Sequence, residues 1–380
     1  MKPTNWISIG AACCFAGFWV VLASPILEVA RGHDFLNLYT GASLAAEGRF
    51  AQLHDPAVQL EREEQLAGPR DVFVPFVRPH FYAAVLAPLA AFPFGVAFGL
   101  WIALHVALLL AVWCWAGKRW GADAVLLAAM YLPAALGIAH AQDGVFLLWI
   151  VLGSYLLAER HREFGAGAVL ALALFKFHLV LLMPLGIAVQ KRWRMLAGFS
   201  AVAVAELLFS IGFAGVAGAR SYIGLLSSDD IERLNPSPER WISLYSFTHN
   251  FDLGAFSPIL LGIGLAVAVG ASLWAIARGD LARLWVVGLS CSLLIAPHVY
   301  GYDAALLLLP LLLVLFGGWG KLSKVAAGIL VAPLTFLLTI ADAPWAAVPA
   351  AALALFVGAV IRDRRSAPAS RLPGSASSAA

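Results

Sequence analysis

The chain has 380 residues, of which 62% are hydrophobic and only 12% charged, with a mean hydropathy of +0.86 and a formal net charge of +3. Soluble domains carry about 25% charged residues, so this composition excludes a soluble globular protein and indicates an integral membrane protein. The small net charge gives no sign of nucleic-acid binding. The four cysteines lie within apolar runs and lack the spacing of a disulfide framework.

The apolar runs predict twelve membrane-spanning helices in one domain. A bilayer core about 30 Å thick is crossed by about 20 helical residues, and shorter helices suffice where protein surrounds them. The first predicted span, Trp6–Leu27, is longer than the apolar core of a signal peptide and lacks a clear cleavage site. The others are 95–116, 122–139, 145–158, 164–176, 177–190, 195–214, 254–277, 282–296, 303–316, 325–341 and 345–361. We therefore expect an all-α polytopic membrane protein with a single domain over residues 1–365.

A polar segment of about residues 28–94 follows the first span and is expected to form the first extracytoplasmic loop. It has the apolar spacing of a short amphipathic helix over residues 35–46. Asp55-Pro56 is typical of an N-cap followed by proline in the first turn of a second helix. Pro88 and Pro93 interrupt the apolar stretch 80–93, which we expect to be re-entrant or interfacial.

The distribution of basic residues predicts the orientation of the spans. The lysines and arginines cluster on one side, at Lys2, Lys118, Arg119, Arg160, Arg162, Lys191, Arg192, Arg194, Arg278, Arg283, Lys321, Lys324, Arg362, Arg364 and Arg365. Cytoplasmic loops are enriched in Lys and Arg, so both termini are expected on the cytoplasmic side. The membrane is expected to be the bacterial plasma membrane. A second extracytoplasmic loop covers about residues 215–253. The tail 366–380 is rich in Ser, Ala, Pro and Gly and is expected to be disordered.

Histidines, basic residues and carboxylates gather in the loops that are predicted to lie on the extracytoplasmic side. Seven of the nine histidines belong to these loops or to the adjoining helix ends. The candidate site residues there are His33, Asp34, Tyr39, Arg78, His80, Gln142, Asp143, Lys176, His178, His249, His298, Tyr302 and Asp303. Each alone is compatible with a solvated loop residue. Together, imidazoles, cations and carboxylates on one face predict an anion-binding site with an acid or base beside it.

Asp34 is the residue around which this site is expected to form. It follows the first span by a few residues, where a charged carboxylate is costly unless a partner or a function offsets the cost. A structural alternative is an interfacial acid paired with Arg31. The histidines His178, His249 and His298 lie on different segments without the paired spacing of zinc ligands, so no metal is predicted. No nucleotide-binding or nucleophile-elbow motif is present, and no cofactor is predicted.

The order of several short motifs resembles glycosyltransferase family 87, multi-pass enzymes of the GT-C fold related to polyprenyl-phosphate-mannose-dependent mannosyltransferases. The resemblance covers about residues 5 to 320. Its motifs are Asp34-Phe35 with Tyr39, Gly48 and Leu53-His54-Asp55-Pro56; Ala87-Pro88-Leu89; Ala141-Gln142-Asp143-Gly144; Phe175-Lys176-Phe177-His178 with Pro184 and Arg192-Trp193-Arg194; and Ala296-Pro297-His298 with Tyr302-Asp303. Val77-Arg78-Pro79-His80 replaces the family's usual Tyr-Pro-Pro.

The resemblance implies a function and two roles. Such enzymes move a sugar, here expected to be a mannose-like hexose, from a polyprenyl-phosphate carrier to an acceptor hydroxyl of a glycolipid or glycan on the extracytoplasmic face. Asp34 matches the general base of the family, and His298 matches a histidine near the donor phosphate.

Chemical reasoning fits this expectation independently. Glycosyl transfer needs a base for the hydroxyl proton and cations for the departing phosphate, for which Lys176, Arg78 and His298 are the candidates. A single base without a second carboxylate nucleophile nearby favours an inverting displacement.

A transporter or lipid flippase is the main alternative, although the chain shows no repeat between its halves. Glu206 is the one clear mid-span acid and is interpreted as packed, protonated or hydrogen-bonded. An oligosaccharide ligase is a further alternative, which the small loops disfavour.

Overall fold

The computed structural model describes residues 6–69, 73–227, 238–251, 254–340 and 344–363, and in these ranges the protein is helical without strands. The predicted tail 366–380 and part of the second loop lie outside the described residues. The helices are α1 (Trp6–Gly32), α2 (Asp34–Ala46), α3 (Pro56–Ala67), α4 (His80–Leu86), α5 (Phe94–Trp120), α6 (Ala122–Met130), α7 (Leu132–Ala139), α8 (Gly144–Glu159), α9 (Glu163–Ala171), α10 (Leu182–Val189), α11 (Trp193–Leu226), α13 (Tyr245–Asn250), α14 (Ser257–Ala277), α15 (Leu281–Ile295), α16 (Leu308–Phe316), α17 (Lys321–Val331), α18 (Pro333–Leu337) and α19 (Val348–Arg362).

Short 3₁₀ segments join several of these helices. They are η1 (Phe50–Gln52), η2 (Ala87–Ala91), η3 (Leu172–Leu179), η4 (Pro238–Arg240), η5 (Gly254–Phe256), η6 (Gly301–Leu307), η7 (Leu338–Ile340) and η8 (Trp345–Ala347). The stretch 80–93 is accordingly the short helix α4 followed by η2, which contains Pro88 and ends at Ala91, and Pro93 directly precedes α5. The break expected inside 164–190 is present too, because Lys176 leaves helical geometry within η3 (φ −125°, ψ 55°).

Four helices among the described residues are long and apolar enough to cross a membrane, over Phe94–Trp120, Trp193–Leu226, Gly254–Ala277 and Trp345–Arg362. The pair α6–α7, bent by 52°, makes a fifth if it is one span. Shorter apolar helices include Gly144–Glu159, Leu281–Ile295 and Gly301–Phe316. The protein is thus an all-helical membrane protein, whereas the count of twelve spans and the single domain over 1–365 stay predictions.

Two predicted boundaries differ from the structure. The span 195–214 does not end in a loop, because α11 bends at Gly215 (φ +66°) and continues to Leu226. The span 325–341 stops at Val331, since Pro333 cannot supply the backbone N–H that would continue α17.

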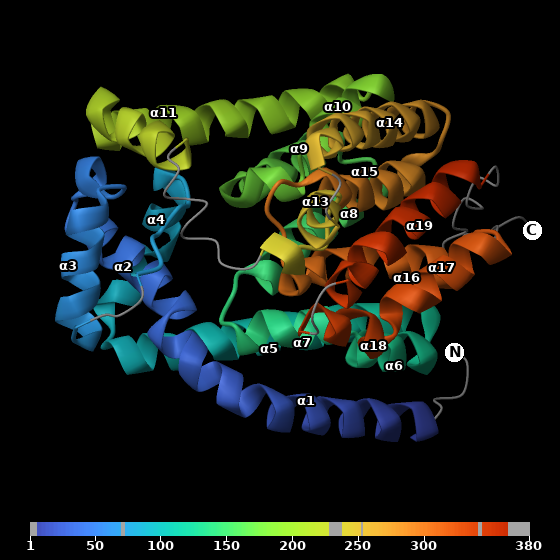
Figure 1. Ribbon diagram of the computed structural model, residues 1–380, viewed down its shortest axis with the longest axis horizontal. Helices are drawn as coiled ribbons and strands as arrows, with labels where there is room; N and C mark the ends of the chain where they lie inside the picture. The colour runs from blue at the N-terminus through green and yellow to red at the C-terminus, as the bar shows by residue number, and fades with distance from the viewer. Residues whose placement is uncertain (1–5, 70–72, 228–237, 252–253, 341–343, 364–380) are drawn as a thin grey trace, which may run out of the picture.

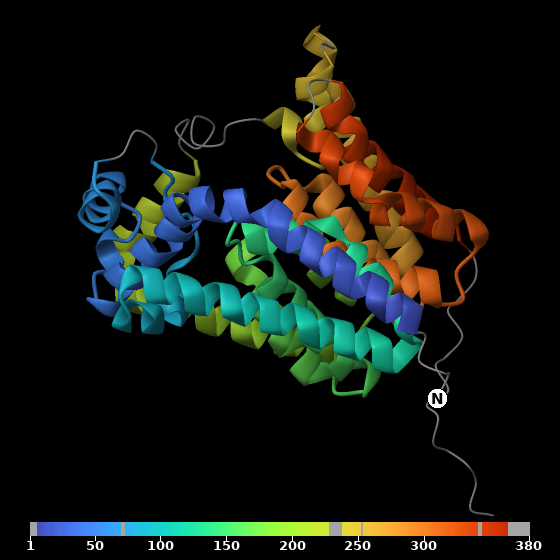
Figure 2. The same ribbon diagram turned by 90° about the horizontal axis from the view of Figure 1, so that it is seen from below.

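The helices α2, α3 and α4 gather at one end of the molecule, and α1 begins and α19 ends at the other end (Figure 1). Seen from below, α19 (red) and the start of α14 (gold) lie on the side away from α5 (cyan) (Figure 2). The most deeply buried helices are α15 and α16, in which Trp285 and most leucines of these two helices are buried. Of the polar residues singled out above, Asp34 and Tyr39 belong to α2 and His80 begins α4.

Candidate active site

Asp34 begins α2 immediately after His33, the residue at which the chain turns out of α1. The apolar spacing of α2 suggested an exposed polar face, yet nearly every residue of this helix is buried. Phe35 packs against the rings of Phe94, Phe98 and Trp101 of α5 at 5.3–6.4 Å between ring centroids. This packing fixes the start of α2 and therefore the position of the Asp34 carboxylate.

The Asp34 carboxylate is held at one oxygen and open toward solvent. Its Oδ1 accepts a hydrogen bond of 2.7 Å from Nε2 of Gln142. Its Oδ2 lies 3.7 Å from Nδ1 of His140, and the Asp34 side chain is 26% exposed. Arg31 lies instead over the ring of Phe94, 5.7 Å from its centroid, and no ion pair joins it to Asp34. The interfacial-pair alternative therefore finds no support in this part of the structure.

A strained turn between α7 and α8 presents the partners of Asp34. Ala141 adopts a left-handed backbone (φ +50°), a conformation that costs a non-glycine residue about 1–2 kcal/mol. Hydrogen bonds from Gln142 N to Gly137 O (2.9 Å) and from Trp101 Nε1 to Ala141 O (2.8 Å) hold the turn in place. The turn directs Gln142 toward Asp34 and places Asp143 at the start of α8.

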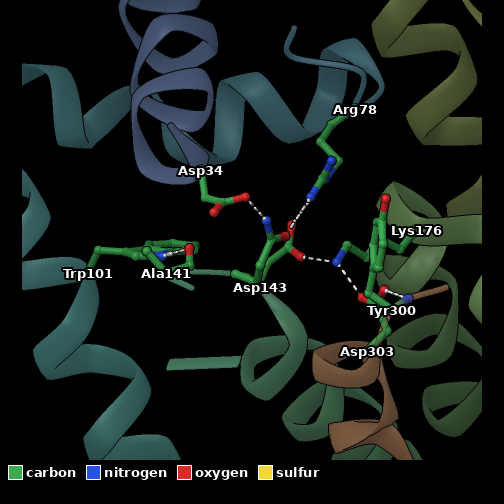
Figure 3. A network of polar contacts seen from close by, with 9 residues as sticks. Asp34, Arg78, Trp101, Ala141, Asp143, Lys176, Tyr300 and Asp303 are labelled. Carbon is green, nitrogen blue, oxygen red and sulfur yellow. Dashed lines mark hydrogen bonds and ion pairs between the residues drawn. The ribbon is translucent and has the colours of Figure 1, made fainter. Parts of the chain in front are cut away.

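Asp143 is the centre of a buried ion-pair network, formed by Arg78, Asp143, Lys176 and Asp303 (Figure 3). Its Oδ2 lies 3.1 Å from Nε of Arg78, and its Oδ1 lies 2.7 Å from Nζ of Lys176. Lys176 also donates to Oδ1 of Asp303 at 2.8 Å. The side chains of Asp143, Lys176 and Asp303 are 0%, 6% and 3% exposed. The ammonium group of Lys176 is therefore withdrawn from solvent and held by two carboxylates.

The electrostatics of the network keep its groups charged. Burial by itself raises the pKa of Asp143, but Arg78 and Lys176 outweigh that effect and hold the pKa well below its usual range. Two cations thus face two carboxylates. Arg78 and Lys176 are the cations that the sequence predicts to bind the donor phosphate. In the structure, each of them has a carboxylate partner.

A row of rings runs from this network toward the second loop. The aromatic row consists of His249, Trp241, His298, Tyr300, Tyr302 and His140, whose successive ring centroids lie 5.0–5.7 Å apart. Hydrogen bonds from Ile242 N to Val299 O (3.0 Å) and from Leu244 N to Leu294 O (2.9 Å) tie the two segments together. His140 brings the row to Asp34, and the row therefore connects the first and second loops.

His298 lies in the middle of the aromatic row. Its ring is 6.3 Å from that of His178, and its buried Nδ1 has no hydrogen-bond partner in the described structure. Burial lowers the pKa of His298 to about 4, so the ring is neutral near pH 7.

Two of the remaining predicted residues, Tyr39 and His80, contact partners other than Asp34. The Tyr39 hydroxyl donates to Phe92 O at 2.7 Å, and this bond anchors α2. His80 Nε2 lies 3.2 Å from Nδ1 of His54, in a buried pair capped by the Tyr222 ring. His33 is partly exposed at the α1–α2 junction.

Sequence reasoning left three residues out of the site, namely His140, Trp241 and Tyr300. The only local signal was their position in polar loops beside residues that were selected, such as Gln142 and Tyr302. Across the described ranges, no group of three or more His, Cys, Asp or Glu side chains is placed to hold a metal ion.

The comparisons with known proteins gave one match. The model of glycosyltransferase family 87 matches residues 76–297, a region that contains Arg78, Gln142, Asp143 and Lys176. Asp34 precedes this region, and His298 follows it directly. No curated protein and no solved structure matches the chain. Because the matched region covers more than half of the 380 residues, the chain belongs to glycosyltransferase family 87.

Proposed function

We propose that this protein transfers a mannose-like hexose from a polyprenyl-phosphate donor to an acceptor hydroxyl of a glycolipid or glycan, at the extracytoplasmic face and with inversion. Asp34 is the general base. One observation carries the proposal: the partly exposed Asp34 carboxylate is oriented by Gln142 and lies at the edge of a buried, charge-balanced network. Family membership supports the broader class of sugar transfer.

The geometry suits a base that receives a proton directly from the acceptor. Gln142 holds Oδ1 of Asp34, which leaves Oδ2 facing the exposed side, next to His140. A fixed carboxylate within hydrogen-bond reach of a hydroxyl accelerates transfer by about 10²–10⁴-fold. The buried Asp143 carboxylate is paired with Arg78 and Lys176 rather than open as a nucleophile, which supports inversion.

The ion-pair network supports donor binding, because its cations can bind the donor phosphate while they remain paired with carboxylates. Lys176 donates a hydrogen bond to Asp303 and forms an ion pair with Asp143, and Arg78 contacts Asp143 and Gln142. Their remaining donors can bind a phosphate oxygen without losing the carboxylates. Because the four groups sum to no net charge, an arriving phosphodiester leaves one negative charge uncompensated. His298, with its unpartnered Nδ1, is the group that takes up a proton to balance it.

The aromatic row supports binding of the transferred sugar. Tyr300 and Tyr302 lie between His140, which is beside Asp34, and His298. Aromatic rings combine an apolar face with a polar edge, which complements a hexose with C–H faces and hydroxyl edges. The reacting carbon would then lie between the base and the phosphate, as an in-line displacement requires.

Proton uptake at His298 gives donor binding a defined pH dependence. The pKa of His298 is about 4 without donor, and an adjacent phosphate anion favours the imidazolium and raises it. The donor complex then binds more protons than the free enzyme, so donor affinity should rise as pH falls from about 8 to about 5. Calorimetric titration with the polyprenyl-phosphate sugar, in two buffers of different ionisation enthalpy, measures the proton uptake.

The His298→Gln variant should lose this proton uptake and bind the donor with little pH dependence. His161→Gln is the matched control, since His161 is exposed in the turn between α8 and α9. Unchanged proton uptake in His298→Gln would assign the phosphate to another group.

Membrane orientation is tested by labelling single cysteines introduced into a variant without the four native ones. Ser227 is exposed after α11 and is expected outside the cell, whereas the 320–324 turn is expected in the cytoplasm. Ser323 is only 1% exposed and donates to Asp363, so exposed Lys321 is the better site in that turn. An impermeant thiol reagent on whole cells should label Ser227→Cys but not Lys321→Cys. Labelling of both would refute the orientation.

A transporter is the competing function. Asp34 and Asp143 lie at the starts of α2 and α8, and Lys176 and Asp303 lie in the 3₁₀ segments η3 and η6 rather than within long helices. Glu206 of α11 is the exception, and both its carboxylate oxygens are buried without a hydrogen-bond partner in the described structure. Such burial favours a packed, uncharged acid. The deciding experiment supplies purified protein in proteoliposomes with radiolabelled polyprenyl-phosphate hexoses and pentoses and looks for a glycosylated lipid. Transport without any transferred sugar would reject the enzyme.

A further inference from the structure

A second charged cavity lies at the other end of the molecule from Asp34, where α14 ends, α15 begins and α19 ends. Its volume is about 670 Å³. Its walls carry three guanidinium groups, Arg278, Arg283 and Arg362, and one carboxylate, Asp363. Trp274 supplies an apolar wall. The lining is therefore basic on one side and apolar on the other.

The carboxylate of this cavity is already bound elsewhere. Asp363 Oδ2 accepts a hydrogen bond of 2.9 Å from the Ser323 hydroxyl and another from Gly320 N, both at the start of α17. Exposed Arg278 and Arg362 have no carboxylate within ion-pair distance among the described residues. Arg278 lies over the Trp274 ring, 4.6 Å from its centroid. The cavity thus offers at least two guanidinium groups to an anion.

The surface that leads to the cavity is apolar. Leu260, Val267 and Trp274 follow one another at seven-residue spacing on one face of α14 and are 49%, 63% and 55% exposed. This stripe runs along a helix of membrane-spanning length and ends at the arginines. A tryptophan at that position is typical of the membrane–water interface.

We propose that this cavity binds the phosphodiester headgroup of an anionic phospholipid, whose acyl chains lie along the exposed stripe of α14. Guanidinium groups bind phosphate through two parallel N–H donors, and basic pockets between membrane helices bind such headgroups. The apolar stripe favours a lipid over free phosphate, because only a lipid uses both halves of the surface. The site is independent of sugar transfer and does not rest on the proposed catalytic function.

The test titrates the purified full-length protein in detergent with cardiolipin, phosphatidylglycerol or phosphatidylcholine and counts bound lipids by native mass spectrometry. The wild type should bind the two anionic lipids and not phosphatidylcholine. The Arg278→Gln/Arg362→Gln variant should bind them at least about tenfold more weakly. The control is Arg160→Gln/Arg162→Gln, which removes the same charge from two exposed arginines of the α8–α9 turn and should bind like wild type.

Three results would overturn the assignment. If the control variant lost as much anionic-lipid binding as the Arg278→Gln/Arg362→Gln variant, the effect would be one of general charge. If the wild type bound phosphatidylcholine as well as the anionic lipids, the binding would be unspecific. Protection of the protein against heat by inorganic phosphate alone, to the same extent as by cardiolipin, would identify a free-phosphate site. Arg278→Gln alone, at an exposed position, provides the comparison if the double variant folds poorly.

Discussion

Asp34→Asn is expected to lower the turnover of sugar transfer by about 10²-fold or more while the protein inserts, folds and binds donor normally. The asparagine keeps the size of the side chain, and its carbonyl oxygen can still accept the hydrogen bond from Gln142. It cannot accept the acceptor's proton as a carboxylate does. Transfer from a radiolabelled polyprenyl-phosphate sugar in proteoliposomes, with the melting temperature followed in parallel, measures both properties.

Two variants make the Asp34 result specific. Asp34→Glu should retain only a trace of activity, because a base displaced by about 1 Å is badly placed for the transfer. Asp55→Asn makes the same chemical change in the same loop, at the N-cap of α3, and should leave turnover unchanged since Asn caps helices as well as Asp. Full activity in a well-folded Asp34→Asn protein would remove Asp34 from the chemistry.

Lys176→Met is expected to lower stability by about 3–5 kcal/mol, because it leaves the buried Asp143 and Asp303 short of a cation. The sequence predicts Lys176 as a phosphate-binding residue, from which weaker donor binding and slower transfer would be expected. The contacts of 2.7 and 2.8 Å to two carboxylates change that expectation. Equilibrium unfolding followed by tryptophan fluorescence measures the loss.

The double variant Lys176→Met/Asp303→Asn tests the cause. It removes one cation and one carboxylate, and Asp143 keeps Arg78 as its partner at 3.1 Å. Stability should recover in large part, whereas transfer should stay low because the phosphate has lost a donor. Arg192→Met is the comparison, since the Arg192–Glu163 pair is equally short at 2.7 Å but its side chains are 25% and 28% exposed. Its loss should cost about 0.2–1 kcal/mol. Equal effects of Lys176→Met and Arg192→Met would contradict the role of burial.

Local patterns were the part of the structure that sequence could predict. The Asp55-Pro56 cap is confirmed, because the Asp55 carboxylate accepts from Ala57 N at 3.0 Å. The helix break at Lys176 is confirmed as well. These features depend on backbone chemistry within a few residues, so neighbouring positions contain all the necessary information.

The pairing within the site was beyond sequence reasoning. Lys176 and Asp303 are 127 positions apart, and no spacing rule relates them. The polar residues Asn37, Thr40 and Ser43 made α2 resemble a surface helix, yet it is buried because α4 and η2 pack over it. The left-handed Ala141 had no glycine to mark it. Each of these features depends on segments that meet only in the folded protein.

The dependence of Lys176 on partners from two distant segments has a consequence for biogenesis. Arg78, Asp143 and Lys176 leave the ribosome first, and these three groups carry one net positive charge until Asp303 has been synthesised and inserted. The charge balance of the ion-pair network is therefore complete only when the C-terminal third of the chain is in place. A truncated or misinserted chain therefore leaves one uncompensated positive charge in this buried network, a cost that the finished protein does not carry.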